Sequence, residues 1–211
     1  EDFDLDYANQ LKGYEETRFN LNGKIAPKGF FGSGLLASPF LFLGNYLDSI
    51  SKNYSMESYS NFMNYGLLLY SLSSIFYMFL TIELLNKILQ NIDISIKKLE
   101  ILLLYASSGV FYYAFERFSM SHIYETFTVT LVIFFTFEYF KNNKNLSAFL
   151  VPLCMLIALL VRLVNYYVLI IPLIVKVVLF KKTAKNIYSN KYFVYSSILS
   201  ILIYSYLSLK I

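Results

Sequence analysis

Charged residues are scarce in this sequence. Asp, Glu, Lys and Arg make up 15% of the 211 residues, whereas ordinary soluble domains carry roughly a quarter. Hydrophobic residues make up 57%, the mean hydropathy is +0.52, and the apolar residues form long runs rather than amphipathic stripes. A soluble two-layer core cannot bury runs of that kind, so the composition predicts a membrane protein.

Cysteine and several catalytic motifs are also missing or nearly so. The single cysteine, Cys154, lies in an apolar run, which excludes a disulfide or a cysteine-based metal site within the chain. The sequence has no phosphate-binding glycine loop followed by Lys and Ser or Thr, no His-Glu-x-x-His and no Gly-x-Ser-x-Gly. These absences disfavour a nucleotide-driven cytosolic activity. We expect the lipid bilayer as a partner, and no nucleic acid.

The two ends of the sequence predict a truncated chain. The first residue is Glu1 rather than Met, and no basic segment or small-residue cleavage site precedes the first acidic stretch. The last apolar run continues to Ile211 without a polar tail. We therefore expect further protein on both sides of this segment.

Apolar runs predict about six membrane spans and an all-α fold. A helix crosses the hydrocarbon core with about 20 mostly apolar residues. The run at 146–180 is too long for one span and is interrupted by Arg162 and Asn165, so it predicts two short helices that meet at this polar break. The other predicted spans are 62–84, 99–115, 123–140 and 193–209.

Lysines alternate between the predicted connections and suggest an orientation. Short cytoplasmic loops accumulate Lys and Arg, so the lysine-rich connections are expected on the inner side. The connections in between carry mainly Arg117 and Arg162 and are expected outside, together with residues 1–61. The lysines after the first, third and fifth predicted spans are Lys87, Lys97, Lys98, Lys141, Lys144, Lys181, Lys182, Lys185 and Lys191.

The chain thus divides into an outer loop, 1–61, and a transmembrane helical domain, 62–211. Within the outer loop, residues 29–42 contain glycines followed by an apolar run that is too short to span. This run is expected to lie in the membrane interface or to dip into it.

An acidic cluster opens the outer loop. Asp2, Asp4 and Asp6 alternate with apolar residues, which places their carboxylates on one side of an extended segment. Such a row can hold a divalent cation or orient a sugar hydroxyl, so these residues are candidate metal ligands and a divalent metal ion is a candidate cofactor. The alternative is an ordinary solvated acidic loop.

A second group of ionisable residues lies between two predicted spans at the outer boundary. His122 is the only histidine, and Glu125 follows three residues later on the same helix face. Ionisable groups at a membrane boundary suggest function. The alternative is structural, with Glu116 and Arg117 as a neutralised interfacial pair and His122 as a helix-capping residue.

Arg162 is the third candidate, because it interrupts the apolar stretch at its outer boundary. Its guanidinium could bind a phosphate of a lipid-linked donor through its planar fork of donors. The alternative is simple snorkelling to lipid head groups.

Three stretches, in this order, resemble bacterial integral-membrane glycosyltransferases of the GT-C superfamily, which includes protein O-mannosyltransferases and aminoarabinose transferases. Residues 2–9, DFDLDYAN, resemble the D-x-D-L-D-x-x-N of their first outer loop. Residues 32–40, GSGLLASPF, resemble the following G-x-x-L-L-x-x-P-F. Residues 108–113, SGVFYY, together with Ser121 and His122 resemble a later pattern of glycine, paired tyrosines and Ser-His, with Val110 where the family has threonine.

The resemblance implies a multi-pass enzyme of the bacterial inner membrane that moves a hexosyl or pentosyl group from a polyprenyl-phosphate donor to a lipid, glycan or protein acceptor outside. It implies a carboxylate in the first outer loop as base or metal ligand. The catalytic candidates are then Asp4, Asp6, His122 and Glu125, and the substrate-binding candidates are Asp2, Asn9, Arg117 and Arg162.

A non-enzymatic polysaccharide or lipid transporter of the flippase type is the alternative. Transporters usually place broken helices and ionisable residues near the bilayer midplane. The charged groups of this sequence cluster at the predicted outer boundary instead, which favours an interfacial active site.

Overall fold

The computed structural model describes residues 20–21, 24–25, 31–54, 65–94, 96–117, 120–180 and 186–208, with side chains from Phe31 onward except at 52–54 and 208. This part of the chain is helical apart from one minimal pair of strands. In that pair, β1 (Asn20–Leu21) lies antiparallel to β2 (Lys24–Ile25), with Asn20 opposite Ile25.

Within the residues that the structure describes, three helices are long and apolar enough to cross a membrane: α2 (Tyr65–Asn91), α5 (His122–Asn142) and the continuous helical stretch Leu163–Phe180. That stretch comprises η1 (Leu163–Ile170), α7 (Ile171–Val175) and η2 (Lys176–Phe180). A shorter apolar helix, α6 (Asn145–Val161), precedes it. The membrane character predicted from composition is supported for these stretches, and the prediction of six spans goes beyond them.

Residues 99–115 form two helices rather than the single span that the hydrophobic run predicted. α3 (Lys98–Ala106) and α4 (Gly109–Phe115) are separated at two serines. The hydroxyls of Ser107 and Ser108 donate to Leu104 O and Tyr105 O, and Ser108 Oγ also accepts from Val110 N as the N-cap of α4. As an N-cap, the Ser108 side chain satisfies a free amide in the first turn of α4 and so favours the start of a new helix at this point.

α1 (Gly32–Tyr54) extends the short apolar run of the predicted outer loop into a helix of 23 residues that continues past Pro39. It has the length of a span, but it is not among the three helices above that are apolar enough. Residues 32–42 of the short segment predicted at 29–42 are therefore part of a longer helix, whose remaining residues are more polar.

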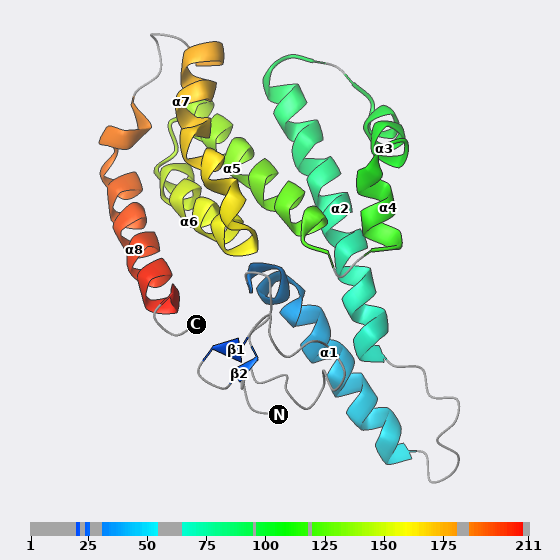
Figure 1. Cartoon of the computed structure of the whole chain (residues 1–211). Coiled ribbons are helices and arrows are strands. Elements are labelled where there is room, and N and C mark those ends of the chain that lie inside the picture. Colours follow the sequence, from blue (N-terminus) through cyan, green and yellow to red (C-terminus); the bar gives the residue numbers. More distant parts are fainter. Residues whose placement is uncertain are drawn as a thin grey trace.

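The helices pack side by side in the order α1, α2, α5, α6 and α8 (Lys191–Ser208), and the Leu163–Phe180 stretch lies against α5 and α6. The short η3 (Ile187–Ser189) leads into α8. Figure 1 shows the end of α2 and the end of α7 on one side of the molecule, and the end of α6 near the start of α1 on the opposite side.

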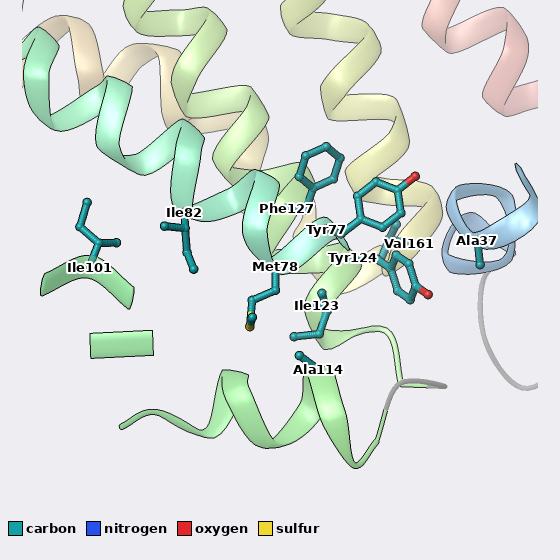
Figure 2. Close-up of a cluster of buried hydrophobic side chains, with 10 residues drawn as sticks. All are labelled: Ala37, Tyr77, Met78, Ile82, Ile101, Ala114, Ile123, Tyr124, Phe127 and Val161. Atoms are coloured by element: carbon teal, nitrogen blue, oxygen red, sulfur yellow. The ribbon is translucent and has the colours of Figure 1, made fainter. Parts of the chain in front are cut away.

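One cluster of buried side chains lies where helices α1 to α6 meet (Figure 2). The Tyr77 ring packs at 4.8 Å from Phe127 and at 5.5 Å from Tyr124, between ring centroids. Buried hydroxyls join the helices: Tyr124 OH and Ser73 Oγ lie 2.7 Å apart, and Ser74 Oγ donates to Ala114 O at 2.6 Å. Small and hydroxylated residues at helix contacts are typical of membrane bundles.

Candidate functional site

The first turn of α5 presents His122 and Glu125 on one face. The two residues are three positions apart, a spacing that brings side chains together on a helix. His122 Nδ1 lies 3.8 Å from Glu125 Oε2. The sequence prediction that these residues share a face is confirmed.

Arg162 reaches the same carboxylate from the end of α6. Its backbone is extended, with φ −155° and ψ 129°, so the helix stops there and resumes as η1. Arg162 Nη1 donates to Glu125 Oε2 over 2.9 Å, between residues 37 positions apart in the chain. One carboxylate oxygen thus faces both the guanidinium and the imidazole.

Asn165 supports the break that places Arg162. Its side chain is fully buried, and Nδ2 donates to Ala158 O at 2.9 Å, a carbonyl that also accepts the backbone amide of Arg162. Within the part of the chain that the structure describes, Asn165 Oδ1 has no hydrogen-bond partner. The asparagine that the sequence marked only as an interruption therefore ties η1 back to the last turn of α6.

Tyrosines border the charged group. The Tyr113 ring of α4 lies 4.3 Å from the His122 ring, between centroids, and Tyr167 of η1 lies near Glu125 and Arg162. Tyr124, in the same first turn of α5, packs against Tyr77 in the buried cluster of Figure 2 and so anchors this turn to α2. The site combines fixed charges with aromatic faces.

The charged groups of the site are partly exposed. The side chains of Arg162 and His122 are 38% and 40% exposed, and that of Glu125 is 18% exposed. A ligand can therefore reach the two basic groups directly, while the carboxylate lies deeper between them. This arrangement suits an anionic ligand at the bases and proton transfer at the carboxylate.

Arg117 lies outside this constellation. Its Nε donates to Tyr112 OH at 3.1 Å, a hydrogen bond that raises the pKa of the guanidinium, and its side chain is open to solvent. The sequence suggested Glu116 as its neutralising partner, whereas the structure gives it the phenol. Arg117 is a fixed positive charge just before α5.

The structure describes two of the four residues, Asp4, Asp6, His122 and Arg162, that were predicted to converge. His122 and Arg162 come together through Glu125. Asp2, Asp4, Asp6 and Asn9 lie outside the described residues, so the acidic cluster, its metal-binding role and its distance from the site stay predictions. Among the residues that the structure describes, no group of three or more His, Cys, Asp and Glu side chains could hold a metal ion.

Sequence reasoning identified His122, Glu125 and Arg162 as candidates, but it did not predict that Arg162 pairs with Glu125. The Arg162–Glu125 contact depends on how α6 packs against α5, and nothing local to either residue predicts it. Tyr113 and Asn165 carried only a weak signal: a tyrosine in the loose glycine-tyrosine pattern, and a polar residue inside an apolar run. Tyr167 carried none.

Comparison with known proteins adds no relative. No family model matches the chain, and neither a curated protein nor a solved structure matches it.

Proposed function

We propose that this chain is the membrane portion of a glycosyltransferase, which transfers a sugar from a polyprenyl-phosphate donor to a lipid, glycan or protein acceptor at the end of the helices where Arg162 and Glu125 meet. The observation that carries the proposal is the Glu125 carboxylate held between Arg162 and His122 in reach of solvent. A carboxylate can accept the acceptor's proton. A guanidinium can bind the departing phosphate, whose charge grows in the transition state.

The length of α6 supports an interfacial site. Its 17 residues rise about 25 Å at about 1.5 Å per residue, close to the roughly 30 Å thickness of the hydrocarbon core. Since the stretch that follows Arg162 is again of spanning length, Arg162 would lie at a boundary of the membrane. A donor with its isoprenoid chain in lipid would present its phosphate at that level.

The finer features of the proposal are a GT-C-like fold with about six spans, a multi-pass protein of the bacterial inner membrane, and Asp4 and Asp6 as further catalytic carboxylates. They rest on the motif resemblance and on the alternating lysines. Asp2 and Asn9 would then line the acceptor or donor side of the same site.

A transporter of the flippase type is the second candidate, because the chain has a broken helix with a buried asparagine at the break. Discontinuous helices line substrate sites in many transporters. The boundary level of Arg162 favours the enzyme, since transporter sites lie near the midplane.

Sugar transfer in proteoliposomes, with the full-length protein and with donor concentration varied, tests the proposal. Arg162→Ala is expected to weaken donor use, and Arg162→Lys to recover only part of it because the planar fork is lost. Loss of a general base at Asp4→Asn or Asp6→Asn is expected to cost about 10²–10⁴-fold in rate.

The matched control is Lys144→Ala, because Lys144 also pairs with a carboxylate of α5, Glu138, but at its other end. If Arg162→Ala behaved like Lys144→Ala and kept full activity, the transferase proposal would lose its central residue. If only the two aspartate variants kept full activity, the catalytic carboxylate would have to be another one.

A further inference from the structure

α5 carries an ion pair near each end, and the two pairs differ in their surroundings. Glu138 pairs with Lys144, six residues away across the next turn, and Glu125 pairs with Arg162 from the far end of α6. The two carboxylates are equally shielded, with side chains 19% and 18% exposed. Among the described residues, the Glu125 pair has a second basic group beside it, His122, and none is recorded beside the Glu138 pair.

The guanidinium of Arg162 is only partly used. It has five N–H donors, and the hydrogen bond from Nη1 to Glu125 Oε2 is the one that the structure shows for it within the described residues. Since 38% of the side chain is exposed, a ligand can reach the guanidinium. A second anion can therefore approach the same guanidinium, but it must come close to the Glu125 carboxylate and is repelled by it.

We propose that the Glu125 carboxylate and the ligand compete for the guanidinium of Arg162. When a phosphate ester binds, its phosphate replaces Glu125 as the ion-pair partner of Arg162. The choice of a phosphate ester rests on the proposed function and on the match between a guanidinium fork and phosphate oxygens. Glu125 then lowers the affinity for the ligand, and ligand binding releases its carboxylate from the guanidinium.

This exchange predicts an effect of opposite sign from that of a residue that merely positions Arg162. The full-length protein in detergent micelles is titrated with farnesyl phosphate, with inorganic phosphate and with farnesol. Glu125→Gln, which keeps the shape and removes the charge, is expected to tighten farnesyl phosphate binding by about 2- to 5-fold, within the range that a partly exposed ion pair can supply. Arg162→Gln is expected to weaken it in both the wild-type and the Glu125→Gln background.

Glu138→Gln is the matched control and is expected to bind like the wild type, since Glu138 lies at the other end of α5. Farnesol, which has no phosphate, should respond to none of these changes. The same tightening with inorganic phosphate supports recognition of phosphate itself, and tightening with farnesyl phosphate alone supports a lipid-borne phosphate.

Unchanged or weaker farnesyl phosphate binding in Glu125→Gln overturns the exchange, as does binding that Arg162→Gln leaves intact. If Glu125→Gln is not monodisperse in detergent, Glu125→Asp provides the same test of sign, because its shorter side chain withdraws the carboxylate from Arg162. The titration contains no sugar and no acceptor. Tighter binding in this titration, together with no sugar transfer in the proteoliposome assay, would therefore overturn the transferase proposal and still support the anion exchange.

Discussion

Gly44 and Gly66 bring the backbones of α1 and α2 into direct contact. A Cβ atom at Gly44 would lie 2.6 Å from Gly66 Cα and 2.7 Å from Tyr65 O, both of them backbone atoms. Backbone atoms cannot move aside as the end of a flexible side chain can. This single position therefore sets how closely the two helices approach.

Gly44→Ala is expected to destabilise the protein by about 1–3 kcal/mol, the usual cost of overpacking a close contact. The control is Gly34→Ala on the same helix, where nothing lies within 4 Å of the added methyl group. It should be neutral or slightly stabilising, because alanine favours helix over glycine. Thermal unfolding of both variants in detergent compares them, and equal melting temperatures would contradict the close contact.

Gly32 has a similar role at the start of α1. A Cβ atom there would overlap the backbone of Leu160 and Val161, in the last turn of α6. Gly32 is the first residue of the motif G-x-x-L-L-x-x-P-F. It lies against α6, the helix that ends at Arg162. Its place in the chain has a packing reason, independent of any family resemblance.

Among the elements, α1 and α2 are joined by a side chain as well as by close packing. Asp48 of α1 accepts hydrogen bonds from Tyr65 N at 2.8 Å and from Gly66 N at 3.0 Å. These are the first two amides of α2, which have no partner within the helix. The carboxylate also lies at the positive end of the helix dipole.

Asp48→Ala is expected to cost about 1–2 kcal/mol, as for the loss of a helix N-cap. Asp48→Asn should recover part of that loss, since its side-chain oxygen can still accept one hydrogen bond but carries no charge. Hydrogen exchange at the amides of Tyr65 and Gly66 measures the effect locally. Protection that survives in Asp48→Ala would mean that the start of α2 is held by other contacts.

At the scale of the whole molecule, α5 separates two chemically different ends. His122 and Glu125 lie in its first turn with Arg162, and Lys141 lies in its last turn, where its Nζ donates to Asn91 Oδ1 at the end of α2. This agrees with the sequence prediction that the basic connections lie opposite the His122 turn. The membrane side of each end remains a prediction from the lysines.

Cysteine labelling tests this orientation. In a Cys154→Ser background, single cysteines at Glu116 and at Lys144 are expected to react with an impermeant reagent from opposite sides of sealed vesicles. Both positions are exposed in the structure, so burial within the protein would not explain a failure of either cysteine to react. Labelling of both from one side would contradict the proposed topology, because α5 would then not cross the membrane.

The sequence by itself determined the class of the protein and the break at Arg162. Long apolar runs need lipid, and a charged residue and an amide residue inside such a run interrupt it. Both features can be read from the sequence, because they depend only on residues that are close together in the chain. The same local reasoning selected His122, Glu125 and Arg162 as ionisable groups at a predicted boundary.

The division of residues 99–115 into two helices has a local cause, the Ser108 side chain that caps α4, but a count of apolar residues does not register a cap. Only the tertiary structure decided that Glu125 pairs with Arg162 and that α1 continues past Pro39 to rest on α2. Both depend on contacts between residues far apart in the chain, such as those of Asp48 and Gly44 with the start of α2.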